Sequence, residues 1–220
     1  LYPAHSFDSL TPLEETMEAF NQLIHDGKVR YIGNSNFCGW QSMKAKSIAN
    51  QRGFQPFISQ QVTYSLLSRD LEMELIPFAL DQGVGSIIWS PLAFGFLTGK
   101  YRRGQKEPEG TRMRELDSSF FQTDMEKMYK IIDVLETIAK TRSKTIPQVA
   151  LNWLLQQPTV SNLIIGARNE AQLRDNLGAV GWNLSPEEVQ TLNEVSAIRE
   201  TYPTWHQRRF AHERNPQLKA

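Results

Sequence analysis

Residues 166–176 carry the side chains whose types and spacing best suit a phosphate group. The segment follows the apolar run 160–165, so a short strand is predicted to end in a glycine turn, Gly166 and Ala167, before a helix. Arg168 stands where that helix begins, and helix N-termini offer unpaired N–H groups and partial positive charge. Arginine adds a planar set of donors that matches phosphate oxygens. On spacing alone, a solvated surface arginine is an equally good interpretation.

Two amide side chains follow the arginine at helical spacing. Gln172 and Asn176 come four and eight residues after Arg168. Side chains at these spacings lie above one another on a helix surface. We therefore predict that all three residues share one helix face.

Positioning these residues requires regular elements, and the chain alternates strand-like with helix-like segments. The predicted strands are 1–5, 29–32, 57–64, 85–89 and 162–165. The predicted helices are about 12–26, 40–49, 71–80, 124–140, 146–156, one from 170 and one over 186–195. A surface loop is predicted at about 102–123, and a tail without helical order at about 200–220. Five such units without hairpin signals predict a parallel sheet in a single α/β domain, 1–220.

Two of these helices begin with recognisable capping sequences. Thr11-Pro12-Leu13-Glu14 reads as a capping box with proline at the first helical position. Ser185-Pro186-Glu187-Glu188 is predicted to cap the last helix in the same way. Both sequences place a hydroxyl where it can accept from a free backbone N–H of the first turn.

The strand ends are where a parallel α/β fold binds its ligands. They carry an imidazole, amides, hydroxyls and an aromatic ring: His5, Ser35, Asn36, Gln60 or Gln61, Trp89, Ser90 and Gly166 to Arg168. Each has a plainer interpretation: a histidine bonded to backbone, a helix cap at Ser35 and Asn36, a core tryptophan. Because all five strands end in such groups, a functional rim is the better interpretation.

Composition narrows the classes of partner. Lys plus Arg and Asp plus Glu balance at 24 each, so no net charge favours nucleic acid or an anionic membrane. No apolar run approaches the roughly 18 residues of a membrane span, and no signal-peptide pattern opens the chain. The single cysteine, Cys38, excludes an internal disulfide and fits a reducing compartment. We therefore expect a cytoplasmic protein without a metal site, in which Cys38 is an inert thiol.

Several motifs resemble those of the aldo-keto reductases, NADP(H)-dependent oxidoreductases on a (β/α)8 TIM barrel. They are Leu1-Tyr2-x-x-His5, Thr11-Pro12-Leu13-Glu14-Glu15-Thr16, Gly27-Lys28-Val29-Arg30-Tyr31-Ile32-Gly33-x-Ser35-Asn36, Gln61-Val62-x-Tyr64-Ser65-Leu66-Leu67-x-Arg69, Ser90-Pro91-Leu92-x-x-Gly95-x-Leu97-Thr98-Gly99-Lys100-Tyr101 and Gly166-Ala167-Arg168. They occur in family order along essentially the whole chain, so the resemblance is specific.

The resemblance implies a role for each matching residue. His5 would orient and polarise the carbonyl group of a small-molecule substrate. The cofactor NADP(H) would be held by the remaining predicted site residues: Ser35, Asn36 and Gln61 on the carboxamide, Trp89 on the nicotinamide ring, Ser90, Leu92 and Gly95 on the pyrophosphate, Gly166, Ala167 and Arg168 at the 2′-phosphate, and Gln172 and Asn176 at the adenosine.

The family's other three catalytic residues, an aspartate, a tyrosine and a lysine, belong to earlier strands and have no counterpart here. Tyr31 and Lys28 do not replace them, because they lie in and before a different strand. Pro3 and Ala4 precede His5 where the family usually has a glutamine. Since the chain also lacks an initiator methionine, we expect the C-terminal part of a longer protein, a partial barrel of about five β/α units.

The expected function is NADPH-dependent reduction of an aldehyde or ketone, inactive in this chain alone. A first alternative is an NADPH-binding docking module like the potassium-channel β subunits of the same family, without significant turnover. A second is a barrel that binds a sugar phosphate through Arg168. We rank it last, because it requires a catalytic lysine or glutamate at a strand end and none is found.

Overall fold

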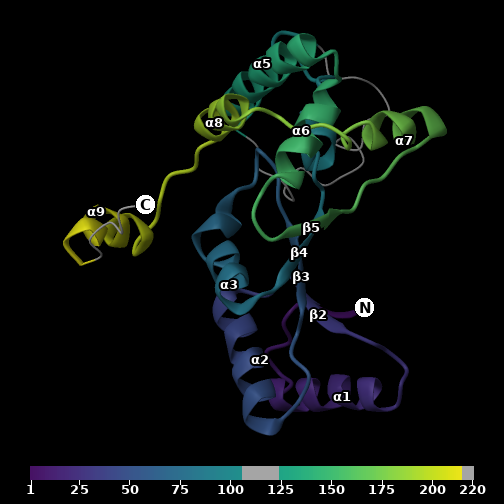
Figure 1. The fold of residues 1–220 in the computed structure, drawn as a ribbon, viewed down its shortest axis with the longest axis vertical. Helices are drawn as coiled ribbons and strands as arrows, with labels where there is room; N and C mark the ends of the chain where they lie inside the picture. The colour runs from purple at the N-terminus through teal and green to yellow at the C-terminus, as the bar shows by residue number, and fades with distance from the viewer. Residues whose placement is uncertain (106–123, 215–220) are drawn as a thin grey trace.

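Five parallel strands form one sheet in the order β1-β2-β3-β4-β5 in the computed structural model, which describes residues 1–105 and 124–214. They are β1 (Tyr2–His5), β2 (Ile32–Ser35), β3 (Ser59–Thr63), β4 (Gly85–Trp89) and β5 (Val160–Leu163). Each strand pairs with the next one along the chain, and helices make the crossovers (Figure 1). The predicted α/β fold is confirmed, and the sequential order is that of consecutive units of a (β/α)8 barrel.

Helices cover one side of this sheet and extend beyond it at the C-terminus (Figure 1). The α-helices are α1 (Leu13–His25), α2 (Gly39–Arg52), α3 (Leu75–Gln82), α5 (Met125–Arg142), α6 (Ile146–Leu155), α7 (Glu170–Leu177), α8 (Pro186–Val195) and α9 (Thr204–Arg214). Two short 3-10 helices, η1 (Asp70–Met73) and η2 (Ala93–Thr98), follow β3 and β4. None of the helices in residues 1–105 and 124–214 is long and apolar enough to span a bilayer.

The helix predicted over 71–80 is wrong in its first half. The chain instead forms η1, breaks at Glu74 and begins α3 at Leu75. Pro77 explains the break, because a proline ring clashes with the carbonyl four residues earlier in a continuous helix. That carbonyl belongs to Met73, the last residue of η1.

The strand predicted over 29–32 begins only at Ile32 and runs on to Ser35. The N–H groups of Lys28 and Val29 donate instead to the carbonyl of Leu23, which ties this segment to the end of α1. Gly33 permits close approach to the next strand, since a Cβ there would lie 2.7 Å from the backbone oxygen of Ser59.

The two predicted capping boxes had different outcomes. The Thr11 prediction is wrong: its hydroxyl donates to the Asp8 carboxylate at 2.6 Å, and α1 begins at Leu13 without a side-chain cap. The Ser185 prediction is confirmed, because its hydroxyl accepts from the Glu188 N–H while the Glu188 carboxylate accepts from the Ser185 N–H.

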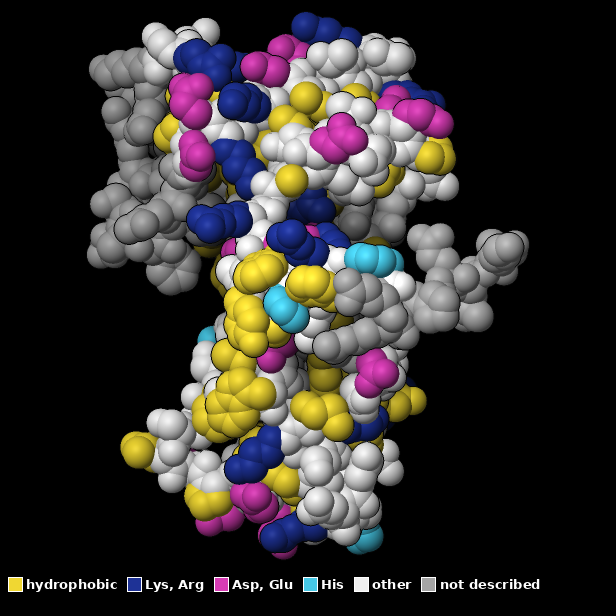
Figure 2. Space-filling model, turned by 90° about the vertical axis from the view of Figure 1, so that its left-hand side faces the viewer, with side chains coloured by type: hydrophobic (Ala, Val, Ile, Leu, Met, Phe, Trp, Pro, Cys, Tyr) yellow, Lys and Arg dark blue, Asp and Glu magenta, His cyan; other side chains and the backbone are white. Residues whose placement is uncertain are grey.

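The C-terminal tail was predicted to lack helical order, and α9 contradicts this over Thr204–Arg214. The helix stands away from the sheet (Figure 1), and Figure 2 shows hydrophobic, basic and histidine side chains gathered at mid-height on the face where it lies. Its aromatic rings contact one another, with His206 4.8 Å from Phe210 between ring centroids. A helix whose aromatic residues contact one another shows no regular hydrophobic periodicity in its sequence, so the periodicity did not predict α9. Most of the predicted loop 102–123 lies outside the described residues.

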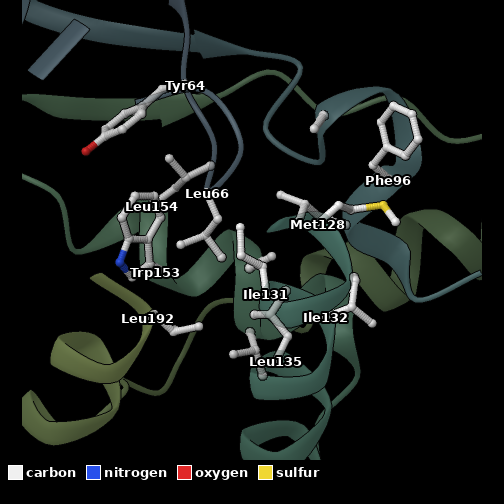
Figure 3. Packing of buried hydrophobic residues seen from close by; sticks show 14 of the residues in the cluster. Tyr64, Leu66, Phe96, Met128, Ile131, Ile132, Leu135, Trp153, Leu154 and Leu192 are labelled. Carbon is white, nitrogen blue, oxygen red and sulfur yellow. The ribbon is translucent and has the colours of Figure 1, made fainter. Parts of the chain in front are cut away.

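The larger hydrophobic core lies between β3 to β5 and the helices α5, α6 and α8. Trp153 and Tyr64 meet edge to face at 5.4 Å between ring centroids, above the aliphatic side chains of α5 (Figure 3). Each buried side chain of this size contributes roughly 1.5–3 kcal/mol through burial. This core fixes the helix-facing side of the sheet and leaves the strand ends to polar residues.

Candidate functional site

His5, Ser35 and Gln61 form one row across three adjacent strands. His5 is paired in register with Ser35, and Ser35 with Gln61. The residue before each of them faces the helices: Asn34, for example, donates to the Ser42 hydroxyl of α2 at 3.0 Å. Because side chains alternate along a strand, the row lies on the opposite face of the sheet. The structure thus brings together three of the predicted site residues.

The choice between Gln60 and Gln61 is decided by this alternation. Gln60 is fully buried on the helix side, where its amide donates to the Leu75 carbonyl and the Ser86 hydroxyl. Gln61 is half-buried in the row. Its backbone carbonyl accepts from the Ser35 hydroxyl at 3.0 Å and from the Asn36 N–H at 3.2 Å. Gln61 is therefore the glutamine available to a ligand.

Left-handed backbone conformations mark three of the strand ends. Ser6, Asn36 and Ser90 each follow the last residue of a strand and have φ values of 62°, 58° and 51°. Such a conformation costs a non-glycine residue on the order of 1–3 kcal/mol and is concentrated at functional sites. It also turns the chain sharply after β1, β2 and β4.

Asn36 lies at the centre of these side chains. Its Nδ2 is 3.4 Å from His5 Nε2, and its Oδ1 accepts from Trp89 Nε1 at 3.3 Å. The second ring nitrogen of the histidine, Nδ1, is 3.4 Å from the Ser6 hydroxyl. The imidazole, the amide and the indole are thus joined in one hydrogen-bonded chain at the C-terminal ends of β1, β2 and β4.

Lys100 is a candidate site residue to which the sequence motifs assigned no role. Partial burial and the neighbouring Arg168 guanidinium lower the pKa of its ammonium group. A Cβ on Gly95, whose φ is 97°, would lie 3.0 Å from Lys100 Nζ. Lys100 therefore lies over the turn after β4, within the electrostatic influence of Arg168. Only the fold reveals this, because 67 positions separate them in the chain.

The predicted shared helix face of Arg168, Gln172 and Asn176 is wrong. Helix α7 begins at Glu170, so Arg168 lies before it, in the turn that also holds Gly166 and Ala167. Asn169 caps the helix by accepting from the Gln172 N–H at 2.9 Å. Gln172 remains beside the arginine, since its Oε1 accepts from the Arg168 N–H at 2.9 Å.

Asn176, in the last turn of α7, is 8% exposed. Little of Asn176 is therefore accessible to a ligand. The exposed surface at this end of the site is therefore formed by Arg168 and Gln172.

The turn after β4 holds the three remaining predicted residues, Ser90, Leu92 and Gly95. The Ser90 carbonyl accepts from the Ala93 N–H at 2.8 Å, and the Leu92 carbonyl from the Gly95 N–H at 2.9 Å. These bonds close a compact loop into η2. The loop connects the Trp89 end of the site to Lys100.

Tyr64 does not belong to this site. Its hydroxyl donates to the Glu72 carboxylate at 2.5 Å, and burial together with that bond raises its pKa far above the ordinary value.

A cavity of about 410 Å³ also lies away from the strand ends that form the site, at the start of β4 and β5, where Leu80 and Val160 line it. Among the described residues, no cluster of His, Cys, Asp and Glu is arranged to hold a metal ion.

Comparison with known proteins gives a consistent assignment. The model of the Aldo/keto reductase family matches residues 1–197. An uncharacterized oxidoreductase, YrpG, of Bacillus subtilis is 38% identical over 196 residues, covering 89% of this chain. A putative voltage-gated potassium channel subunit beta of Schizosaccharomyces pombe is 35% identical over 203 residues, covering 87% of it. In both cases the match covers 57% of the relative, so the chain spans little more than half its length.

The solved structures agree with this relation. The glycerol dehydrogenase AKR11B4 of Gluconobacter oxydans superposes with a TM-score of 0.75 and 28% sequence identity. The superposition covers 91% of this chain and 60% of that chain. A partial (β/α)8 barrel is therefore the fold of the described residues within 1–197.

Proposed function

The chain belongs to the aldo/keto reductase family, and we propose that it supplies the carbonyl-binding histidine and the NADPH site of a reductase acting on aldehydes or ketones. The single observation that carries the proposal is the placement of His5 beside Asn36 and Trp89, in one row with Ser35 and Gln61. Imidazole, amide and indole groups at one strand edge suit a nicotinamide ring and the carbonyl group that it reduces. The oxidoreductase name of the Bacillus relative supports the reaction class.

The nicotinamide end of the proposed site fits the donor set. A carboxamide needs both an acceptor and a donor, which the side chains of Asn36 and Gln61 can supply. Gln61 makes no side-chain hydrogen bond to another described residue, so its amide is available. Trp89 is half-buried and offers a ring face next to the same amide.

The phosphate end fits equally well. The positive charge of Arg168 lowers the pKa of Lys100, and a bound anion would offset this repulsion. Gly95 leaves open the space below the ammonium that a Cβ would fill. A dinucleotide with a 2′-phosphate supplies negative charge for both cations, which favours NADPH over NADH.

In this proposal the cofactor supplies the hydride when bound, and the protein supplies position and charge. His5 Nε2 is the ring atom that faces the site, and as an N–H it would donate to the carbonyl oxygen as negative charge develops there. Trp89 shields one side of the reacting centre from water. Ser35 is buried and holds its hydroxyl on the Gln61 carbonyl, which keeps the two strand ends together.

Cofactor binding tests the proposal directly. Titration of the 220-residue chain with NADPH should quench tryptophan fluorescence, and Trp89→Phe should remove most of the quenching while Trp205→Phe should not. His5→Ala should leave NADPH affinity nearly unchanged, because the imidazole lies away from the proposed phosphate contacts. Absence of saturable NADPH binding, or equal affinity for NADPH and NADH, would reject the cofactor assignment.

A docking module without significant turnover is the second candidate. The Schizosaccharomyces pombe relative favours it, because it is named as a putative channel subunit rather than as an enzyme. Both candidates require NADPH binding, so reduction of a reactive aldehyde such as 4-nitrobenzaldehyde separates them. Binding without turnover in a protein that also carries the family's tyrosine and lysine would favour the docking module.

A further inference from the structure

We propose that Asn36 sets the tautomer of His5 and couples nicotinamide binding to the histidine's ability to donate a hydrogen bond. The basis is the chain of contacts Trp89 Nε1–Asn36 Oδ1, Asn36 Nδ2–His5 Nε2 and His5 Nδ1–Ser6 Oγ. The first part of the proposal concerns the cofactor-free protein and stands by itself. The second part, the response to nicotinamide, rests on the proposed function.

The direction of every bond in this chain follows from the indole. Tryptophan Nε1–H can only donate, so the Asn36 atom 3.3 Å away must be the carbonyl oxygen. The amide nitrogen then faces His5 and donates, which makes Nε2 an acceptor without a proton. A neutral imidazole carries its proton on the other nitrogen, so Nδ1–H donates to the Ser6 hydroxyl.

The backbone supports this arrangement at two points. Asn36 and Ser6 both have left-handed φ values, 58° and 62°, and the side chains of both contact the imidazole. The N–H of Asn36 is fixed on the Gln61 carbonyl at 3.2 Å, and the N–H of Ser6 on the Ser35 carbonyl at 2.9 Å. The amide and the hydroxyl are thus held on opposite sides of the ring by two separate strand ends.

The consequence concerns the proposed reaction. With its proton on Nδ1, His5 presents a lone pair at Nε2 and cannot donate to a carbonyl oxygen there. When the nicotinamide carboxamide engages the Asn36 amide, the donor leaves Nε2. The imidazole can then carry its proton on Nε2 and turn it toward the carbonyl oxygen. His5 is in this way a donor only after the nicotinamide has bound, and Asn36 acts as a positioning residue.

Nuclear magnetic resonance of the histidine side chains tests the first part. Long-range ¹H–¹⁵N correlation distinguishes the two neutral tautomers, and His5→Gln identifies the signal among the four histidines. At mildly alkaline pH we expect the Nδ1–H pattern in the cofactor-free chain. The Nε2–H pattern there would overturn the proposal.

Asn36→Asp is the most informative variant, because the carboxylate keeps the acceptor for Trp89 but cannot donate to His5. It should change His5 to the Nε2–H tautomer without any cofactor. An unchanged Nδ1–H pattern would contradict the proposal. If this variant does not fold, Trp89→Phe tests the same point. Loss of the indole donor frees the Asn36 amide to rotate, so His5 should become a mixture of the two tautomers. Trp205→Phe is the matched control and should leave the pattern unchanged.

The second part is tested by adding saturating NADPH, with binding followed separately by fluorescence. We expect the His5 signal to change from the Nδ1–H to the Nε2–H pattern. Bound NADPH with an unchanged tautomer would overturn the coupling while leaving the proposed function intact. Absence of NADPH binding would instead reject the cofactor assignment, and the cofactor-free spectra would still decide whether Asn36 sets the tautomer.

Discussion

Arg168 is the residue on which cofactor choice depends in the proposed function. Replacing it with alanine should weaken NADPH binding by about 1.5–3 kcal/mol, the range for a hydrogen bond to a charged group, and leave NADH nearly unchanged. Arg174→Ala is the matched control, because this arginine lies on α7 but is exposed and paired with Glu170. Fluorescence titration with both cofactors provides the measurement. Equal losses for NADPH and NADH would show that another group makes the discrimination.

Lys100 gives the proposed cofactor site a pH dependence. Its pKa lies below the ordinary 10.5 because of partial burial and the Arg168 charge, and a bound phosphate would raise it again. NADPH affinity should therefore be highest below the pKa that Lys100 has in the cofactor-free chain, and should fall as pH rises through that pKa. The 2′-phosphate, with a pKa of about 6, stays ionised throughout this range.

The measurement is the NADPH dissociation constant at a series of pH values from neutral upward. Lys100→Met should lower affinity and flatten the profile. Lys140→Met, which changes an exposed lysine of α5 paired with Glu136, should do neither. A profile that keeps its slope in Lys100→Met would assign the titration to a different group.

At the scale of elements, Arg69 connects η1 to the end of α8. Its guanidinium donates to both oxygens of Glu72, to the Asn193 carbonyl at 2.8 Å and to the Ser196 hydroxyl at 2.7 Å. It also lies over the Trp153 ring, 5.3 Å from the centroid. One side chain thus joins segments that are 124 or more residues apart.

Arg69→Met should consequently destabilise the fold. We expect a loss of roughly 3 kcal/mol, the lower end for a buried pair that loses one partner, because Glu72 keeps 27% of its side chain exposed. Urea unfolding measures this loss. Arg174→Met removes an exposed pair and should cost only about 0.3–0.5 kcal/mol. Similar losses in the two variants would mean that the connection contributes little to stability.

Local sequence signals predicted most of these elements, and the failures have physical causes. Apolar spacing and the Ser185 cap correctly indicated α8, and the run before Trp89 indicated β4 to the residue. Thr11 failed as a cap because a neighbouring carboxylate took its hydroxyl. The prediction of helix 71–80 gave too little weight to Pro77.

The candidate site was predictable in part, because strand ends gather wherever strands are parallel. His5, Asn36 and Trp89 were therefore expected near one another, and they are. Lys100 could not be found from spacing, since its position depends on the turn of η2 and on β5 lying beside β4. The periodic pattern alone left the choice between Gln60 and Gln61 uncertain by one residue; the family motif pointed to Gln61, and the strand register agrees with it.

At the scale of the whole molecule, the sheet within the described residues has two open edges. β1 pairs only with β2, and β5 only with β4. Exposed apolar side chains lie at or beside these strands, among them Tyr2 at 50% and Ile164 at 44% exposure. Open strand edges with apolar neighbours favour association with other strands. The proposed site lies at the C-terminal ends of the same strands, so association at the edges would also affect its geometry.

The last prediction is that the 220-residue chain alone does not reduce carbonyl compounds. Each proposed cofactor contact lies in the described residues, so NADPH binding can occur. We expect no proton donor for the alkoxide in that part of the chain, because no tyrosine hydroxyl there is hydrogen-bonded to His5 and Tyr64 is buried against Glu72 with a raised pKa. General acid catalysis contributes roughly 10²–10⁴-fold, so its loss should leave little activity.

The test follows NADPH absorbance with 4-nitrobenzaldehyde, using chain that is first shown to bind NADPH. His5→Ala serves as the baseline, because it lacks the proposed carbonyl-binding group. If the unmodified chain is inactive, its rate of NADPH oxidation should equal that of His5→Ala. Turnover close to that of a complete family member would contradict the prediction. The proton would then come from a group outside the proposed site, and Tyr202 is the first to replace with phenylalanine, since 74% of its surface is exposed.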